Sequence, residues 1–353
     1  MKSFIYSLLL VTALASCDAM GSNSSEENDE KKGKKVTSRD LSITKENSYS
    51  DLFTDSMLLE KFIVQDAVPD SLARRLRSFY NARNYQLAWF TSNGLTEQAR
   101  GFWNLHDYHT TYNHDSVLHD KKLQKKMDAL TAAEDLSVRT SDSSIIRTEF
   151  TLTEHFIQYM LQVYDDGYVK RKEMERFVPF KKVDAMQQAD SLLNKKHKDD
   201  KYFEDVNTAY KGLKEQLGIY YNIAKGGGWP MVEASKKSYK LGASAPEIVA
   251  IKKRLSLTGD MPASDTSALF TDTLELGVKS FQVRHGYTPD GVVTAALIKD
   301  MNVPAATRVQ QLLINLDRMR WMPNKPSGDL ILVNIPEFVL HVMDGTKKVF
   351  DMN

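Results

Sequence analysis

Few residues in this sequence are suited to covalent catalysis. Cys17 is the only cysteine among the 353 residues, so no cysteine nucleophile lies beyond position 17 and no disulfide framework can form. The G-x-S-x-G arrangement of a serine nucleophile is also absent. Its nearest match, Gly242 to Pro246, is typical of a helix cap. The chemistry available to these residues is therefore anchoring and binding.

A histidine-rich stretch could suggest a metal site. Four of the eight histidines lie close together and alternate with aspartates: His106, His109, His114 and His119 with Asp107, Asp115 and Asp120. Histidine and carboxylate are good zinc ligands, but this spacing matches no metallohydrolase pattern such as H-E-x-x-H. The neighbouring Asn, Thr and Ser residues favour an exposed loop or a frayed helix. We expect no metal and no cofactor here.

A second group of polar residues lies between Phe281 and Gly291. Gln282, His285 and Asp290 offer an amide, an imidazole and a carboxylate that could face a ligand. Phe281 and Gly291 also fit a purely structural role, since apolar helix faces and left-handed glycines usually build the fold. The two interpretations, binding and structural, both remain open for this stretch.

The elements that position this stretch are three short helices. We expect Asp272 and Glu275 to form the capping box of one helix, which ends at Gly286 in a left-handed conformation. Ser244 and Glu247 predict a similar capping box for an earlier helix, and Thr294 predicts the cap of a later one. Each helix carries an apolar face at helical spacing: Ile248, Ile251 and Leu255; Leu274, Val278 and Phe281; Leu297, Ile298 and Met301. Three helices around a small shared core follow.

The same residues carry a family resemblance. The order of short motifs resembles the three-helix peptidoglycan-binding module of bacterial wall enzymes: Leu241-Gly242, Leu255 with Thr258-Gly259-Asp260, Phe281-Gln282, His285-Gly286 and Asp290-Gly291. The resemblance covers residues 239–303. It implies that Phe281, Gln282, His285, Asp290 and Gly291 bind peptidoglycan.

Residues 1–17 resemble an export signal. Lys2 supplies a positive end, and the apolar run from Phe4 to Leu14 is too short to span a bilayer. Leu14 to Cys17 resembles a bacterial lipobox, which implies lipidation of Cys17 and a periplasm-facing membrane lipoprotein of the cell envelope. Ordinary signal cleavage after Ala15 is the alternative.

Residues 18–50 are predicted to form a disordered tether. Ser22 to Glu30 is rich in Ser, Asn and Glu, and Lys31 to Lys35 is basic. The early acidic stretch is similar to lipoprotein sorting signals, and a plain solvated linker is the alternative. Across the whole chain, 47 Lys and Arg residues balance 46 Asp and Glu residues, so no charge excess indicates nucleic-acid binding.

Residues 51–235 have the periodicity of a helical scaffold. Apolar stripes recur at helical spacing: Leu72, Leu76 and Phe79; Phe156, Tyr159, Met160 and Val163; Tyr210, Leu213, Leu217, Tyr220 and Tyr221. The order of further motifs resembles the scaffold domain of large L,D-transpeptidases: Tyr80 to Arg83 with Ala88-Trp89, Leu152-Thr153 with Phe156 to Tyr159, and Gly227 to Pro230.

The last part of the sequence changes from helical to strand periodicity. Pro304 begins a helix over residues 304–322, similar to the connector of the same family. Leu330 to Ile335 is typical of a buried strand, and Asp344-Gly345 predicts a hairpin. Asn334 to Pro336 followed by Phe338 resembles the first strands of an L,D-transpeptidase catalytic domain. Residues 329–353 are therefore expected to be the incomplete start of that domain.

The expected fold class is mainly α: a helical scaffold, a three-helix module and the first strands of an incomplete β domain. The resemblance implies an L,D-transpeptidase, which cross-links peptidoglycan stem peptides through a cysteine acyl-enzyme. The family's catalytic histidine and cysteine are expected beyond Asn353, so this chain alone is predicted to be inactive. The alternative is a non-catalytic peptidoglycan-binding lipoprotein. The expected partners are peptidoglycan and, through Cys17, a membrane.

Overall fold

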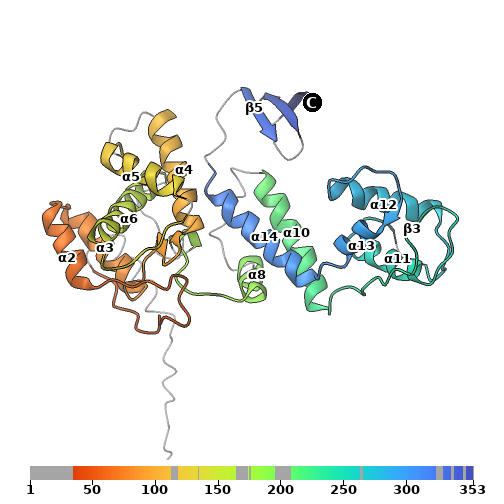
Figure 1. Cartoon of the computed structure of the whole chain (residues 1–353), viewed down its shortest axis with the longest axis horizontal. Helices are drawn as coiled ribbons and strands as arrows, with labels where there is room; N and C mark the ends of the chain where they lie inside the picture. The colour runs from red at the N-terminus through yellow and green to blue at the C-terminus, as the bar shows by residue number, and fades with distance from the viewer. Residues whose placement is uncertain are drawn as a thin grey trace, which may run out of the picture. The chain divides into compact units, whose positions relative to one another are not determined.

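The computed structural model describes residues 35–112, 118–133, 135–163, 174, 176–194, 208–262, 265–322, 329–334, 338–344 and 347–352. The described residues are mainly helical, as predicted, with a few short antiparallel strands (Figure 1). The chain divides into two compact units, and each is described by itself. The predicted signal sequence and Cys17 lie outside the described residues.

Unit 1 consists of Met1–Thr96 and Asp120–Phe180. Four helices and one two-stranded hairpin form its described part: α2 (Ser56–Gln65), α3 (Asp70–Ala82), α5 (Lys121–Ala132) and α6 (Ser143–Val163), with β1 (Phe90–Thr91) and β2 (Gly94–Leu95). Asp55 and Asp120 cap α2 and α5 by accepting hydrogen bonds from backbone N–H groups of the first turn.

The core of unit 1 lies between α3 and α6. The predicted stripe of Leu72, Leu76 and Phe79 is buried on α3, and Phe156 is buried on α6. Aromatic rings join the two helices, since Tyr80 meets Phe150 edge to face at a centroid distance of 5.1 Å. The stripe predicted for α3 is therefore confirmed, and so are Phe156, Tyr159 and Met160 of the stripe predicted for α6.

Part of the segment predicted as a tether is structured. The backbone N–H of Asp40 donates to the carbonyl of Asn81, and that of Tyr49 donates to the carbonyl of Phe180. Ile43 and Ser50 are fully buried. The sequence predicted disorder here because the segment has few apolar residues. Backbone and side-chain hydrogen bonds contribute to holding it in place, and such bonds leave no apolar pattern in the sequence.

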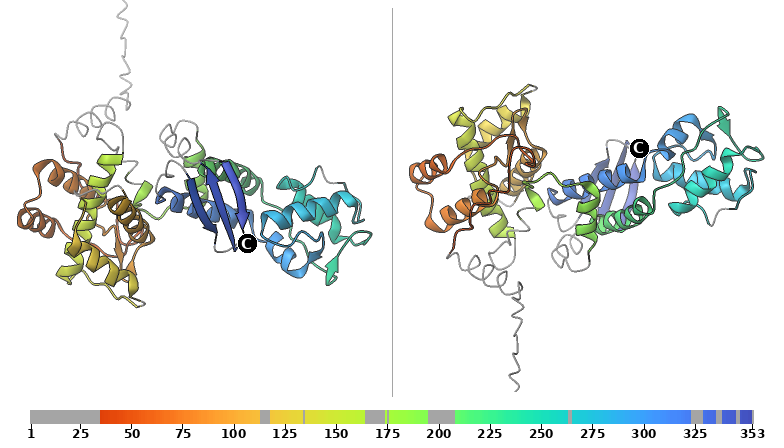
Figure 2. Two further views of the ribbon diagram at one scale, coloured as in Figure 1. Left: turned by 90° about the horizontal axis from the view of Figure 1, so that it is seen from above. Right: turned by 90° about the horizontal axis from the view of Figure 1, so that it is seen from below.

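Unit 2 consists of Glu97–His119 and Lys181–Asn353. Its helices include α4 (Glu97–Tyr112), α8 (Ala185–Leu193), α10 (Thr208–Lys225) and α14 (Ala305–Arg320). Helices α10 and α14 lie side by side (Figures 1 and 2). Leu217 of α10 shares a core with Val309 and Leu316 of α14, and all three are fully buried.

Within unit 2, residues 238–301 fold as a small module. It contains β3 (Ser238–Tyr239), α11 (Glu247–Leu257), α12 (Asp272–Arg284), β4 (Val293–Thr294) and α13 (Ala295–Met301). Strands β3 and β4 pair in antiparallel fashion. All nine residues of the three predicted stripes are buried in one cluster, so the three-helix core is confirmed.

Two of the predicted helix caps are wrong. Thr271 rather than Asp272 caps α12, and its hydroxyl accepts from the N–H of Leu274. Ser244 does not cap α11, because the helix begins three residues later and Glu247 accepts instead from Ser235 N–H and Tyr239 Oη. The predicted cap at Thr294 is confirmed.

The last described strands form one antiparallel sheet. Strands β5 (Asp329–Asn334), β6 (Val339–Asp344) and β7 (Lys347–Met352) pair in chain order, which confirms the predicted hairpin. Ile331, Leu332 and Val333 of β5 are exposed, contrary to the expected buried strand. A strand is buried on both faces only when layers cover both faces of its sheet.

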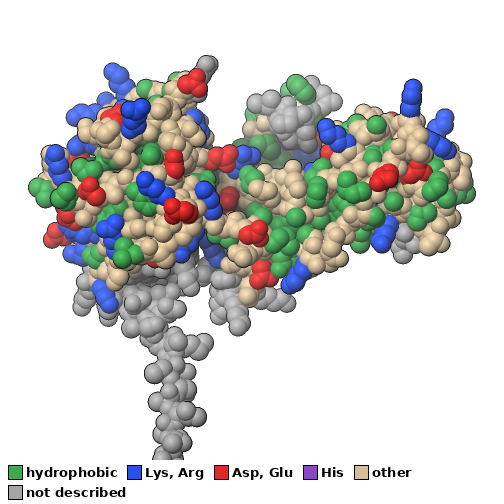
Figure 3. Space-filling model, turned by 60° about the horizontal axis from the view of Figure 1, so that its bottom comes forward, with side chains coloured by type: hydrophobic (Ala, Val, Ile, Leu, Met, Phe, Trp, Pro, Cys, Tyr) green, Lys and Arg blue, Asp and Glu red, His purple; other side chains and the backbone are tan. Residues whose placement is uncertain are grey.

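The charges on the surface are mixed. On the face drawn in Figure 3, Lys and Arg side chains are interspersed with Asp and Glu side chains, and neither sign forms a continuous patch. This agrees with the near balance of 47 cationic and 46 acidic residues. No helix within the described residues is both long and apolar enough to cross a bilayer.

Candidate functional site

The predicted site residues gather at the C-terminal end of α12 and the turn that follows it. Phe281 is fully buried in the core of the module. Gln282 is only 4% exposed, and its amide holds the turn: Nε2 donates to Asp290 Oδ1 at 2.6 Å, while Oε1 accepts from Gly291 N–H at 2.9 Å. The side chains of both residues are therefore occupied inside the module.

Asp290 and Gly291 form the turn itself. Asp290 Oδ1 also accepts from the N–H of Val292 at 2.9 Å, and these hydrogen bonds lower the pKa of its carboxyl group. Gly291 has a φ of +75°, and a Cβ there would lie 2.6 Å from Cγ of Glu275. The carboxyl group of Asp290 is exposed and ionised, so of these two residues it is the one available to a ligand.

His285 is partly exposed and stacks on Phe281, with ring centroids 4.0 Å apart. Its Nε2 is buried and has no hydrogen-bond partner. Burial, followed by the charges of Arg284 and Arg308, lowers the pKa of His285 to about 4. His285 is therefore a neutral imidazole at pH 7, suited to hydrogen bonding rather than to carrying a charge.

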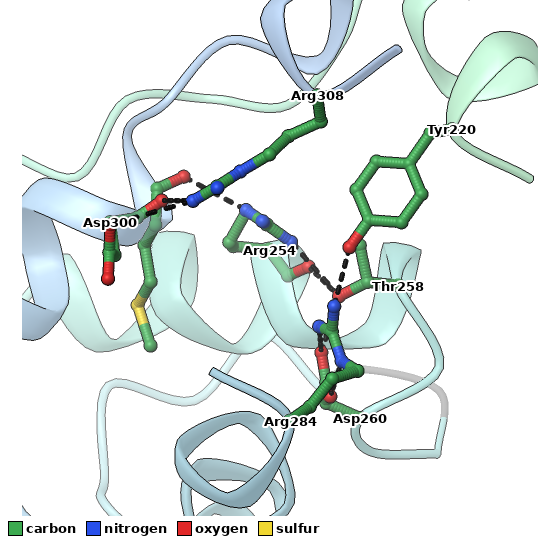
Figure 4. Close-up of polar contacts among 8 residues, drawn as sticks. Tyr220, Arg254, Thr258, Asp260, Arg284, Asp300 and Arg308 are labelled. Carbon is green, nitrogen blue, oxygen red and sulfur yellow. Dashed lines mark hydrogen bonds and ion pairs between the residues drawn. The ribbon is translucent and has the colours of Figure 1, made fainter. Parts of the chain in front are cut away.

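A network of arginines next to these residues was not predicted. Arg284 Nε and Nη2 donate to the two carboxylate oxygens of Asp260 at 3.0 and 2.5 Å, and Nη1 donates to Tyr220 Oη (Figure 4). Arg284 lies three positions after Phe281 on α12, which places both on one side of the helix. This spacing is the feature of the sequence from which the position of Arg284 beside Phe281 could have been predicted.

Arg254 is the most enclosed member of this network. It is fully buried, and its guanidinium lies 3.6 Å from the ring centroid of Trp229. Its Nε donates to the carbonyl of Met301 and its Nη1 to Thr258 Oγ1. It follows Ile251 by three positions on the buried face of α11, but a cation at such a position is usually expected to be exposed.

The histidines of the histidine-rich stretch do not form a metal site in the described part of the chain. His106 is buried and stacks on Trp103 with ring centroids 4.8 Å apart, while His114 lies outside the described residues. Among the residues that the structure describes, no group of three or more His, Cys, Asp or Glu side chains could hold a metal ion.

Comparison with known families identifies one region. Residues 74–217 match the Scaffold domain, a domain found in L,D-transpeptidases. The match begins within α3, ends within α10 and lies inside the range 51–235 expected for a scaffold. No curated protein matches the chain.

Proposed function

We propose that this is a cell-wall protein of the L,D-transpeptidase type, and that residues 239–303 bind peptidoglycan. The observation that carries the proposal is the order along the chain. A Scaffold domain match over residues 74–217 is followed by a three-helix module, which buries all of its predicted stripe residues and carries the short motifs that resemble a peptidoglycan-binding module. Each feature alone is weak support, whereas their succession is typical of a wall enzyme.

The chemistry of the module fits reversible binding. Asp290 presents an ionised carboxylate, and His285 presents a neutral imidazole one helical turn beyond Phe281. A few placed polar groups on a small surface suit the amide and hydroxyl groups of peptidoglycan, but they give modest affinity. We therefore expect binding to multivalent sacculi to be stronger than binding to single fragments.

These 353 residues supply docking rather than bond formation. Acyl transfer by an L,D-transpeptidase requires a cysteine thiolate activated by a histidine, and the one cysteine here is Cys17 in the predicted signal. A non-catalytic peptidoglycan-binding lipoprotein is the second candidate function, favoured by that single cysteine. Both candidates require the module to bind the wall.

Co-sedimentation of the purified chain with peptidoglycan sacculi tests the proposal. The chain should pellet with sacculi in a saturable way. Asp290→Asn should weaken binding several-fold, because it removes the charge but keeps an oxygen for the hydrogen bonds from Gln282 and Val292. His285→Ala should weaken binding as well.

The matched control is Glu60→Gln, which removes an exposed carboxylate from unit 1 where it pairs with Arg77. This variant should pellet like the parent chain. A parent chain that is folded by circular dichroism but stays in the supernatant would exclude wall binding by the module. Equal binding by Asp290→Asn, His285→Ala and the parent would show that the wall is held by other residues.

A further inference from the structure

Arg254 is a buried cation without a counterion. Its side chain is fully buried, and burial lowers the pKa of its guanidinium to about 10, so it stays charged at neutral pH. No carboxylate forms an ion pair with it in the described part of the chain. Asp260 contributes some attraction, but its two oxygens bind Arg284 and Thr258. A buried charge without a partner is costly, so this arrangement needs an explanation.

Nearby cations make this cost larger. Arg284 and Arg308 are close enough to Arg254 that the charge of each lowers its pKa. Arg284 is paired with Asp260, and Arg308 lies 3.6 Å from Asp300 Oδ1 while donating to the carbonyl of Asp300 (Figure 4). Three guanidinium groups therefore face two carboxylates, which leaves one positive charge uncompensated at Arg254.

Several buried hydrogen-bond donors around Arg254 are also unused. Arg254 Nη2, Arg308 Nε and Trp229 Nε1 are each buried without a hydrogen-bond partner. Trp229 stacks on Arg254, and the rings of both Trp229 and Phe281 lie within 5.5 Å of its guanidinium carbon. Buried N–H groups are nearly always satisfied in proteins, so several orphans in one cluster indicate an absent acceptor.

We propose that this cluster is a binding site for a small oxyanion, held by Arg254 Nη2 with Arg308 and the indole N–H of Trp229. A carboxylate or phosphate group would supply a negative charge for Arg254 and several acceptor lone pairs for the unused donors. A water molecule would satisfy one or two of the donors but would leave the charge unpaired. The ligand class is therefore a carboxylate or a phosphate, and the site is independent of wall binding by Asp290 and His285.

The indole N–H of Trp229 provides a local probe. The chain has four tryptophans, so its ¹⁵N–¹H indole spectrum is simple, and Trp229→Phe assigns the resonance. Sodium acetate and sodium phosphate are titrated separately at constant ionic strength, with chloride as the balancing salt. The Trp229 resonance should move in a saturable way with an oxyanion, while the indole of Trp89 in unit 1 should not move.

The same titration should raise the unfolding midpoint of unit 2 by about 2–4 °C when the oxyanion is in several-fold excess over its dissociation constant. Arg254→Gln should weaken the binding at least about tenfold, since a charged hydrogen bond is lost. Arg318→Gln is the matched control, because Arg318 is an exposed arginine of α14 that pairs with Glu97 away from the cluster. It should leave the titration unchanged.

The arms of the experiment separate the possible outcomes. Saturation by acetate alone identifies a carboxylate site, saturation by phosphate alone a phosphate site, and saturation by both a general oxyanion site. No movement of the Trp229 resonance, or equal movement with chloride, would overturn the proposal. If Arg254→Gln does not fold, Arg308→Gln replaces it, and unchanged binding in the folded variant would equally contradict the assignment.

Discussion

Glu149 is a fully buried carboxylate at the centre of unit 1. It accepts hydrogen bonds from the backbone N–H groups of Ala88 and Trp89 at 2.6 and 3.0 Å and from Tyr80 Oη at 2.9 Å. It therefore fixes the segment before β1 to helix α6. Burial nevertheless outweighs these donors and raises the pKa of Glu149 to about 7.

This raised pKa makes the stability of unit 1 depend on pH. Between the ordinary pKa of a glutamate, 4.5, and a pKa of about 7, the folded state binds more protons than the unfolded state. The free energy of unfolding should therefore fall as pH rises through this window, by on the order of 3 kcal/mol. Urea unfolding between pH 4.5 and pH 8 measures this change.

Glu149→Gln should remove this part of the pH dependence. It should also lower the free energy of unfolding by about 1–3 kcal/mol at pH 5. The NH₂ group of the glutamine would face one of the buried donors, which would then have no acceptor. Glu60→Gln is the control for a carboxylate in an exposed pair and should retain the downward slope. A slope unaffected by Glu149→Gln would show that Glu149 titrates normally.

At this scale the sequence predicts apolar positions well and buried charges poorly. Leu72, Leu76 and Phe156 follow a helical period and are buried as predicted. Arg254 also lies at helical spacing from Ile251, but a charged residue such as Glu149 or Arg254 is assigned to the surface unless its partners are known. Most of those partners lie tens of residues away along the chain, as Ala88 does from Glu149 and Met301 does from Arg254, so a local pattern does not reveal them.

Helices α4 and α14 of unit 2 meet at a glycine. A Cβ on Gly101 would lie 2.7 Å from Cγ of Trp321, and Phe102 contacts the same indole with ring centroids 6.3 Å apart. Glu97 and Arg318 form an exposed ion pair between the two helices. The close approach of α4 to the end of α14 therefore depends on the absence of a side chain at position 101.

Gly101→Ala should destabilise unit 2 by about 1–3 kcal/mol, because the rigid indole must move to admit the methyl group. Gly212→Ala in α10 is the matched control, since no atom outside its helix lies within 4 Å of the added Cβ. It should be neutral or stabilise the protein by up to about 1 kcal/mol through helix propensity. Thermal unfolding of the two variants decides the matter, and equal effects would contradict the packing assigned to Gly101.

The sheet of β5, β6 and β7 differs from the helical elements in its burial. All residues of β7 are exposed, and Ile331 and Val333 of β5 are 65% and 60% exposed. The hairpin was predictable because Asp344-Gly345 is a strong turn signal. The exposure of β5 was not predictable. An apolar run is typical of a buried strand, and the run alone does not show whether another layer covers the sheet.

We expect amide protons of β5 and β7 to exchange far faster than those of α12 and α14. Few buried apolar contacts hold these strands, so they open at low free-energy cost, while the helices exchange only with larger unfolding. Hydrogen–deuterium exchange of the 353-residue chain, followed by mass spectrometry, measures both sets of peptides. Protection of β7 equal to that of α14 would contradict this prediction.

The whole molecule combines a proposed anchor with a proposed binding module. The lipobox-like sequence from Leu14 to Cys17 motivates the anchor, since a diacylated cysteine gives stable membrane attachment. Cys17→Ala should move the expressed protein from the membrane pellet to the soluble fraction, or leave it unprocessed. Ser16→Ala, which keeps the cysteine, is the control. A Cys17→Ala protein that resists carbonate washing as the parent does would contradict the anchor.

The central claim is that the turn after α12 binds peptidoglycan. Amide ¹⁵N–¹H spectra of the chain, titrated with soluble muropeptides, test it most directly because they locate the contact. The shifts should cluster between Phe281 and Gly291, with weak affinity and no change in the amides of α3 or α6. Saturable shifts confined to unit 1, or no shifts at millimolar muropeptide, would contradict the claim.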